Sequence, residues 1–339
     1  MPVRVLFLSD THLGFDLPMR PRIRRRRRGH DFLANYQRAL APALAGDVDL
    51  VIHGGDVFHR PKVPPSLAYQ AFEPLKRIAD RGVPVFVVPG NHERSRIPHA
   101  RFAAHPGIEV FADPCTFRLQ VDGVRVALAG FPYARKVRRD FGALMRSTGW
   151  CRDDADVSVL CVHHCFEGAT VGPSDYTFRT APDVVRGSDI PEGFAAVLTG
   201  HVHRHQVLTK DLLGRALAAP VFYSGSVERT AFAEMDEAKG FLLLDLEADE
   251  AGSGGRLVRW RFETLPARPM VLRELVVHRT PPAALQRWVE ASVGEAPADA
   301  VLRLRIRGSI PASAREALTA ARLRAMAPPS MNVELLVTE

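Results

Sequence analysis

The feature that most constrains the fold of this chain is a series of short apolar runs, most of them continuous rather than alternating. The runs are VRVLFLSD, DLVIHGGD, VPVFVVPGNHE, VRVALAGFPY, VSVLCVHH, AAVLTGHVH, PVFYSGS and GFLLLDLE. Continuous apolar runs of this length are typical of strands covered on both faces. Helix-like segments lie between several of them, including one with Ser66 placed as an N-cap and Gly82 as a stop signal. The pattern predicts an α/β fold of layered sheets with helices outside them.

The pattern changes after LPARPM, residues 265–270. A strand VLRELVVH, a helix PAALQRWVEASVG, a strand AVLRLRIRG, a helix SAREALTAARLRAMA and a strand NVELLVTE follow. We therefore expect one large domain over residues 1–265 and a small α/β domain over residues 266–339. A unit of about 70 residues is close to the lower limit for independent folding, so we expect it to pack on the first domain.

The composition is that of a soluble globular protein, with 46% hydrophobic and 24% charged residues. No apolar run approaches the roughly 20 residues that a membrane-spanning helix needs. The first apolar run is too short for the core of a secretory leader. The four cysteines form no CxxC pair, so neither a disulfide framework nor a zinc ribbon is indicated. We expect a cytoplasmic protein without membrane contact.

The formal net charge of +7 is concentrated in one short segment near the N-terminus. Seven arginines there account for all of it: Arg20, Arg22, Arg24, Arg25, Arg26, Arg27 and Arg28. A local patch of this kind favours a binding role more than a diffuse excess of charge does. Taken by itself, however, such a run is more typical of a solvated or disordered loop.

Most of the apolar runs end in side chains that can bind metal ions. In chain order these are Asp10, His12, Asp56, His59, Asn91, His92, His163, His164, His201 and His203. The carboxyl ends of strands in a layered α/β sheet converge on one crevice, where ligands bind. We therefore expect these side chains to form a single cage of nitrogen and oxygen donors.

The donor types favour particular ions and a particular reaction. Histidine and carboxylate ligands suit manganese, iron or zinc rather than calcium. A carboxylate such as Asp56 can bridge two ions about 3.5–4 Å apart, an arrangement that activates water and clamps a phosphate for in-line attack. Each motif taken singly is weak, because a lone histidine or a GGD turn is more often structural. Five such motifs in fixed order at strand ends indicate a site for two divalent metal ions.

The order D-x-H, G-D-x-x-H, G-N-H-[DE], H, G-H-x-H resembles that of the calcineurin-like metallophosphoesterases over roughly residues 3–245. This resemblance implies a layered β-sandwich flanked by helices. It implies a first metal site formed by Asp10, His12, Asp56 and His203. It implies a second formed by Asp56, Asn91, His163 and His201. Cys165 stands where the family has proline, so His164 remains an alternative to His163.

The same resemblance implies roles for two residues beside the ligands. His92 corresponds to the family's histidine that protonates the leaving oxygen or stabilises the transition state. Glu93 stands where related nucleases usually carry aspartate, and we expect it to orient His92 or a metal ligand.

Other segments narrow the resemblance to the SbcD-type, Mre-like DNA repair exonucleases. They are HLGFD, GDVFHRPKVPPS and YSGSVERTAFAEMDEAKGFLLLDLE. The resemblance implies a metal-dependent DNA exonuclease or endonuclease, with manganese as the expected cofactor and His59 near the scissile phosphate. It also implies a capping domain over residues 266–339. Beside such a centre, DNA-backbone binding becomes the better interpretation of the seven arginines.

The resemblance also implies partners other than DNA. It implies a homodimer and a coiled-coil ATPase of the SbcC kind, although no docking segment for the ATPase is evident after the last expected strand. Two other functions stay open. One is hydrolysis of small phosphoesters by a phosphodiesterase or phosphatase. The other is a DNA-end-binding scaffold without catalysis, against which the complete ligand set argues.

Overall fold

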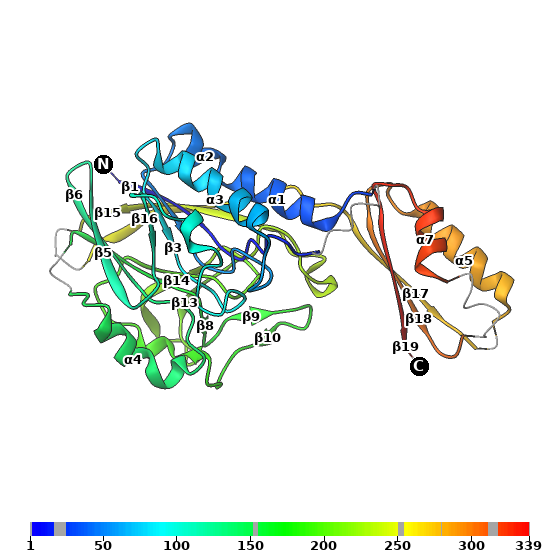
Figure 1. Ribbon diagram of the computed structural model, residues 1–339. Helices are drawn as coiled ribbons and strands as arrows, with labels where there is room; N and C mark the ends of the chain where they lie inside the picture. Colours follow the sequence, from blue (N-terminus) through cyan, green and yellow to red (C-terminus); the bar gives the residue numbers. More distant parts are fainter. Residues whose placement is uncertain are drawn as a thin grey trace. The chain divides into compact units, whose positions relative to one another are not determined.

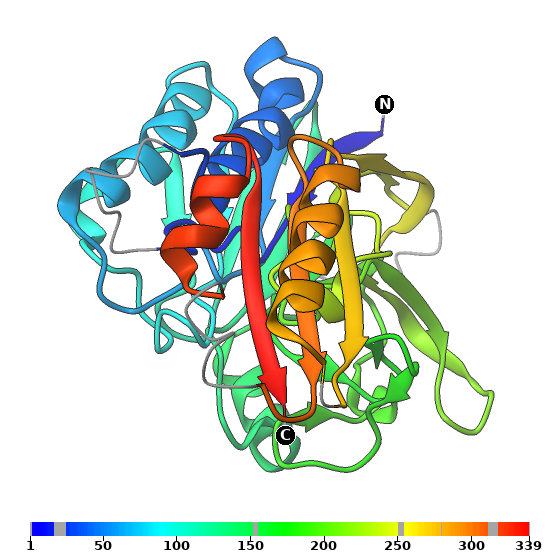
Figure 2. The same cartoon turned by 90° about the vertical axis from the view of Figure 1, so that its right-hand side faces the viewer.

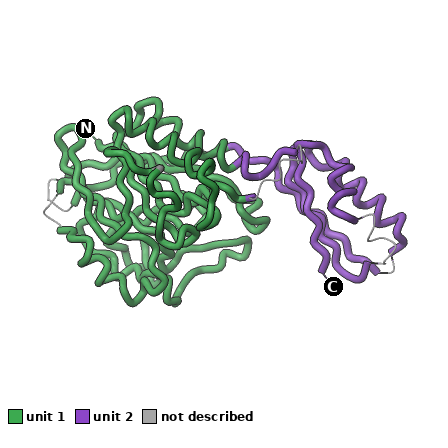
Figure 3. The backbone as a smooth tube through the Cα atoms, in the orientation of Figure 1, with its two compact units in different colours: residues 1–15, 32–265 green, residues 16–31, 266–339 purple. Residues whose placement is uncertain are grey.

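A computed structural model describes most of the chain and divides it into two compact units (Figure 3). The described residues are 2–16, 25–151, 155–249, 254–278, 280–310 and 318–338. The first unit comprises residues 1–15 and 32–265, and the second comprises residues 16–31 and 266–339. The expected domains were residues 1–265 and 266–339, whereas the compact units group residues 16–31 with residues 266–339. None of the described helices is long and apolar enough to cross a membrane.

Two six-stranded mixed sheets form the centre of the first unit (Figure 1). The first sheet has the order β16-β15-β1-β2-β3-β4, and the second has the order β13-β14-β12-β7-β6-β5. The first contains β1 (Val3–Leu8), β2 (Leu50–His53), β3 (Val85–Val87), β4 (Ile108–Val110), β15 (Gly240–Glu247) and β16 (Arg256–Thr264). The second contains β5 (Cys115–Val121), β6 (Val124–Gly130), β7 (Val157–Val162), β12 (Ala196–Thr199), β13 (Gln206–Lys210) and β14 (Ala216–Tyr223).

Parallel pairing runs through the middle of both sheets, with β1-β2-β3-β4 in the first and β6-β7-β12-β14 in the second. The outer strands β16, β15, β13 and β5 pair antiparallel with their neighbours. The described part of the unit also contains two small ladders and short 3-10 helices at Ala100–Phe102, Gly187–Asp189 and Phe232–Glu234. The ladders pair β8 (Cys165–Phe166) with β11 (Val184–Val185), and β9 (Thr170–Val171) with β10 (Tyr176–Thr177).

The continuous apolar runs follow from burial on both faces of each sheet. In β1, Val5 and Phe7 belong to the core between the two sheets, whereas Leu6 and Leu8 belong to the core under the helices. Successive strand residues point to opposite faces, so only a strand covered on both sides needs apolar residues at every position. The predicted layered α/β arrangement is confirmed.

Helices cover the outer faces of the two sheets (Figure 1). They are α1 (Arg28–Ala39), α2 (Ala41–Ala45) and α3 (Pro65–Ala79) over the first sheet, and α4 (Val137–Ser147) over the second. The prediction that Ser66 caps α3 was wrong, because the helix already begins at Pro65, with Pro64 at the N-cap position. Proline fits this first position because its missing N–H would have no partner there.

The second unit contains a three-stranded parallel sheet with helices on one face (Figure 2). Its elements are β17 (Met270–Val276), α5 (Pro282–Glu295), β18 (Val301–Arg307), α7 (Ala320–Met326) and β19 (Asn332–Thr338). Along β18 the residues alternate, since Leu302, Leu304 and Ile306 enter the core of this unit and the arginines between them face away.

Asp31, in the N-terminal part of the second unit, makes buried polar contacts with the C-terminal part. The Arg268 guanidinium lies 2.8 Å from the Asp31 carboxylate, and both side chains are buried. Arg268 also donates a hydrogen bond of 2.8 Å to the Ser330 carbonyl. The N-terminal segment is thereby joined to the start of β17 and to the turn before β19.

Candidate metal centre

The structure brings the expected site residues of the first unit together at the ends of its parallel strands. Asp10 and His12 follow β1, Asp56 and His59 follow β2, and Asn91 and His92 follow β3. In the second sheet, His163 follows β7, and His201 and His203 follow β12. Both sheets therefore contribute donor side chains to the site, from the carboxyl ends of their parallel strands.

A first group of donors lies around His12. The Nε2 atoms of His12 and His203 are 2.9 Å apart. The Asp10 Oδ1 atom lies 3.9 Å from His203 Nε2, and Asp10, His12 and His203 could hold a metal ion together.

A second group lies around Asn91. Its Oδ1 atom is 2.8 Å from His201 Nδ1 and 3.0 Å from His163 Nε2. His163 Nε2 is in turn 3.5 Å from Asp56 Oδ2.

Asp56 connects the two groups. Its Oδ2 atom lies 3.5 Å from His163 Nε2 in the second group and 4.0 Å from His12 Nε2 in the first. Ligand atoms about 2.1 Å from one metal ion are separated by roughly 3 Å when they are adjacent. The observed separations therefore fit two neighbouring divalent cations with the Asp56 carboxylate between them.

Burial keeps two of these histidines neutral, which is the form that binds metal ions. Burial, reinforced by neighbouring His203, lowers the pKa of His12 well below its ordinary value. Burial likewise lowers the pKa of His201 to about 3, with His163 acting in the same direction. Burial by itself would raise the pKa of Asp56, but His163 and His12 outweigh it and hold that pKa below the usual range. His163 and His203 differ from these two. Burial by itself would lower the pKa of each, but Asp56 outweighs burial and raises the pKa of His163 to about 9, and the hydrogen bond to Glu234 outweighs it and raises the pKa of His203.

Strained backbone directs these side chains inward. Asp10, His12, Asp56 and His201 adopt positive φ angles of 52°, 43°, 51° and 80°. Each such conformation costs about 1–3 kcal/mol in a non-glycine residue, and strain of this kind concentrates at functional sites. Gly90 permits the close approach of two loops, since a Cβ there would lie 2.2 Å from Asp56 Oδ1.

Residues outside the cluster fix the orientation of its histidines. His163 Nδ1 donates to the Gly54 carbonyl at 2.7 Å, and His203 Nδ1 lies 3.1 Å from Glu234 Oε1. Glu234 also pairs with the buried ammonium of Lys239 at 2.8 Å. A histidine ligand commonly donates its other N–H to a carboxylate or carbonyl in this way. The expected site residues did not include Glu234 or Lys239, although both lie in the AFAEMDEAKG segment that supported the family resemblance.

Glu93 connects the loops that follow β2 and β3. Its carboxylate accepts hydrogen bonds from the N–H groups of Phe58 at 2.7 Å and Gly90 at 2.8 Å. Among the described contacts it does not bond the His92 ring, so its observed contacts orient the loops rather than that side chain. Burial, with a further contribution from Asp56, raises the pKa of Glu93 to about 8.

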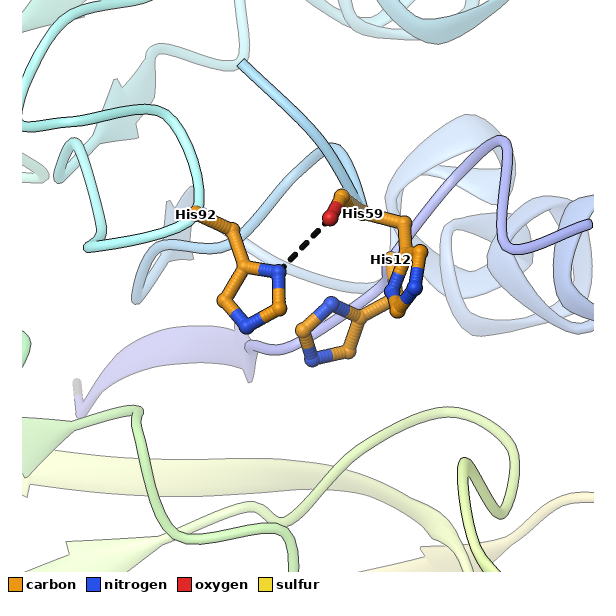
Figure 4. Close-up of side chains that lie close together, drawn as sticks. All are labelled: His12, His59 and His92. Atoms are coloured by element: carbon orange, nitrogen blue, oxygen red, sulfur yellow. Dashed lines mark hydrogen bonds between the residues drawn. The ribbon is translucent and has the colours of Figure 1, made fainter. Parts of the chain in front are cut away.

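His92 lies beside His12, with ring centroids 4.7 Å apart (Figure 4). Its Nδ1 donates to the His59 carbonyl at 2.7 Å, which leaves Nε2 3.9 Å from Asp56 Oδ2. His59 lies beside it, with ring centroids 5.4 Å apart. Burial, with His92 nearby, lowers the pKa of His59 to about 4. The imidazoles of His12, His59 and His92 could also hold a metal ion.

The structure places His163, rather than His164, among the donors. His164 turns away, and its Nε2 accepts a hydrogen bond of 3.3 Å from the Ala134 N–H.

Four of the seven arginines have partners inside the second unit. Arg25 donates to the carbonyls of Ala327 and Pro328 at 2.9 and 3.1 Å, near the end of α7. Arg26 and Arg28 lie 2.7 and 3.8 Å from Asp31, and Arg27 lies 2.9 Å from Asp16. Arg20, Arg22 and Arg24 lie outside the described residues. DNA binding by this run stays a prediction.

Two helix-covered mixed sheets, with aspartate, asparagine and histidine converging from their strand ends, define a metallophosphoesterase fold and site. The chain belongs to the calcineurin-like phosphoesterase family, whose sequence profile matches residues 3–205.

The chain is also similar to curated proteins named DNA double-strand break repair protein Mre11. It is 31% identical to that of Haloferax volcanii over 80% of this chain and 54% of the relative. It is 25% identical to that of Methanopyrus kandleri over 77% of this chain and 56% of the relative. The chain thus matches about half the length of these relatives. The chain is also similar to the solved structure of a dimetal phosphatase from Danio rerio. The two are 12% identical with a TM-score of 0.43, and the match covers 78% of this chain and 99% of the phosphatase.

Proposed function

We propose that this protein is a metal-dependent nuclease that hydrolyses DNA phosphodiester bonds in double-strand break repair or DNA end processing. The observation that carries the proposal is the position of Asp56 between two convergent donor groups, with His92 Nε2 facing it at 3.9 Å. The names of the curated relatives favour DNA as the substrate.

In this proposal one ion would be held by Asp10, His12, Asp56 and His203. The other would be held by Asp56, Asn91, His163 and His201. Nitrogen and oxygen donors without thiolates suit manganese, iron or zinc, and the family resemblance makes manganese the expected ion. When bound, the two ions supply Lewis-acid activation of the phosphate and of the attacking water.

The protein's own groups supply orientation and a proton. The His59 carbonyl keeps the Nδ1 proton of His92 in place, so Nε2 is the nitrogen directed at the reacting group. In its protonated form this nitrogen can give its proton to the leaving oxygen, as a general acid. Glu234 holds the His203 ring, and Glu93 holds the two loops that carry Asp56 and His92. Each role depends on a contact already formed within the chain.

The partners belong to the same proposal. DNA is the substrate, and we expect a homodimer acting in the cytoplasm with an SbcC-like coiled-coil ATPase. The residues 266–339 would act as a capping domain. Size-exclusion chromatography with light scattering, alone and with such an ATPase, tests both associations.

The central test is a nuclease assay on blunt, recessed and circular DNA with manganese, magnesium or a chelator. We expect cleavage with manganese, none with the chelator, and loss of at least a hundredfold in activity for Asp56→Ala and for His92→Ala. General acid–base groups contribute about 10²–10⁴ in rate, which sets this expectation for His92. Full activity in either variant would contradict the assignment. Turnover of a small ester without any of DNA would favour a small-molecule phosphodiesterase, and tight DNA binding without cleavage would favour a scaffold.

A further inference from the structure

The loop between β6 and α4, residues 131–136, lies against the second donor group. The Tyr133 ring stacks on His164, with centroids 5.2 Å apart and an interplanar angle of 24°. It also lies 5.7 Å from the His201 ring and 6.3 Å from the His163 ring. An aromatic side chain is therefore in contact with two of the histidines proposed to hold the second ion.

The backbone of Tyr133 is fixed to the segment that carries Asn91 and His92. Its N–H donates to the Pro89 carbonyl at 3.0 Å, and its carbonyl accepts from Ser95 Oγ at 2.5 Å. These two partners lie on either side of Asn91 and His92 in the chain. Because both backbone groups of Tyr133 are bonded there, the ring has a defined position relative to the site.

The hydroxyl of Tyr133 is an unused hydrogen-bonding group. It makes no hydrogen bond to any residue that the structure describes, and the side chain is only partly buried. Two other tyrosines differ in this respect, since the hydroxyl of Tyr36 donates to the Ala71 carbonyl and that of Tyr223 to the His164 carbonyl. A phenolic O–H beside a phosphoesterase centre suits a phosphate oxygen, because hydrogen bonds to ionised acceptors are the stronger ones.

Exposed cations flank this tyrosine. Arg135 and Lys136 follow it, and Arg94 and Arg96 lie on the segment to which its backbone is bonded. None of the four forms an ion pair with a carboxylate in the described ranges, in contrast to Arg26, Arg27 and Arg28 of the arginine run. Unpaired cations next to a phosphate site favour contacts with further phosphates of a polymer.

We propose that this loop is a phosphate-recognition element of the active site. The Tyr133 hydroxyl donates a hydrogen bond to a non-bridging oxygen of the scissile phosphate. Arg135 and Lys136, together with Arg94 and Arg96, contact the phosphates that flank it in a polynucleotide. The proposal rests on the phosphodiesterase function proposed above. It identifies the surface by which the enzyme would prefer a polynucleotide over a small phosphoester.

The tyrosine is tested with Tyr133→Phe, which keeps the ring and removes only the hydroxyl. We expect kcat/KM to fall about 10- to 100-fold on both duplex DNA and bis(4-nitrophenyl) phosphate, as when a hydrogen bond to a charged group is removed. The Kd for Mn²⁺ and the Tm should remain those of the natural protein. Natural kcat/KM on both substrates would overturn the role of the hydroxyl. A fall accompanied by weaker Mn²⁺ binding would overturn it too, because the effect would then come from the metal ligands.

The cations are tested with Arg135→Glu/Lys136→Glu against a control with the same charge change, Arg77→Glu/Lys210→Glu. Arg77 and Lys210 are exposed, on α3 and β13. We expect only the loop variant to raise the KM for DNA by tenfold or more, and to raise it by a larger factor than the KM for the small ester. The slope of log affinity against log salt should become shallower by about 0.9 for each phosphate of duplex DNA that the variant no longer neutralises. Equal weakening by both double variants would refute a local contact.

Failure of the proposed function can be distinguished from failure of this inference. Binding of a fluorescent duplex is measured by anisotropy for the same variants, so a protein that binds but does not cleave DNA still tests the loop. If the natural protein cleaves only the small ester, the nuclease proposal fails. Tyr133→Phe then decides the role of the hydroxyl on that ester alone. Unchanged anisotropy and unchanged ester turnover in all loop variants would reject the inference whatever the substrate.

Discussion

Replacing Glu234 with glutamine removes the charge that orients a proposed metal ligand while nearly preserving the shape of the side chain. Glu234 Oε1 lies 3.1 Å from His203 Nδ1 and accepts from Thr230 Oγ1 at 2.6 Å. Its other oxygen pairs with Lys239 at 2.8 Å. The substitution therefore acts on His203 without removing a direct metal ligand.

The expected loss in metal affinity is about 10- to 100-fold. This range is typical when the carboxylate behind a ligating histidine is removed. The fold should survive, because Lys239 retains its ion pair with Glu237 at 2.9 Å and its hydrogen bond to the His203 carbonyl at 2.8 Å. We expect a loss of about 1–3 kcal/mol in the free energy of unfolding, as for one hydrogen-bonded charged contact.

Isothermal titration of metal-free protein with Mn²⁺ measures the affinity, and denaturant unfolding measures the stability. Glu237→Gln is the matched control, since Glu237 pairs with the same lysine and with Arg204 but is not bonded to His203. The control should lose similar stability and keep its Mn²⁺ affinity. If both variants bind Mn²⁺ as tightly as the natural protein, the orienting role of Glu234 is refuted.

The same carboxylate should make the stability of metal-free protein depend on acid pH. Burial by itself would raise the pKa of Glu234, but the His203 hydrogen bond and the Lys239 charge outweigh it and hold that pKa well below 4.5. A group whose folded-state pKa is depressed contributes stability above its unfolded pKa and loses that stability as pH falls. The difference in unfolding free energy between natural protein and Glu234→Gln should therefore shrink below about pH 4.5. A constant difference down to about pH 3 would contradict the charge-based explanation.

Two further substitutions test other parts of the structure. Gly90→Ala would place a Cβ 2.2 Å from Asp56 Oδ1, so we expect Mn²⁺ binding, measured by titration, to be lost or weakened at least tenfold. Natural affinity would show that the two loops can separate without cost. Arg268→Ala breaks the buried pair with Asp31 and should cost about 3 kcal/mol in denaturant unfolding. The Arg273→Ala control, at a partly exposed position, should cost under about 1 kcal/mol, and equal effects would contradict the importance of burial.

The layered fold and the convergence of the site were predictable because both depend on local patterns. A strand buried on both faces needs a continuous apolar run, and the residue after a parallel strand must emerge at the sheet edge. Asp10, Asp56 and Asn91 could therefore be assigned to one crevice from their positions alone. The choice between His163 and His164 could not, because it depends on how the chain turns after β7.

Contacts between residues far apart in sequence were not predictable in the same way. Tyr133 lies beside the site because its backbone bonds to Pro89 and Ser95, about 40 residues earlier in the chain. Glu234 is adjacent to His203 only because the segment after β14 folds back over it. Neither residue belongs to a spacing pattern, so a short-range pattern gives no signal for it.

The basic residues show why charge has to be judged together with its partners. A run of consecutive arginines is conspicuous in a sequence. In the structure, however, Arg25 donates hydrogen bonds to carbonyls near the end of α7, and Arg26 and Arg28 lie close to the Asp31 carboxylate. A guanidinium already bonded within the chain must exchange those bonds for a phosphate, which reduces the net gain from binding. Scattered cations such as Arg135 and Lys136 give up no described ion pair when they bind a polymer. Their contribution to DNA affinity should therefore exceed that of the arginine run, residue for residue. Charge reversals at Arg26 and at Arg135, compared by anisotropy, decide between the two surfaces.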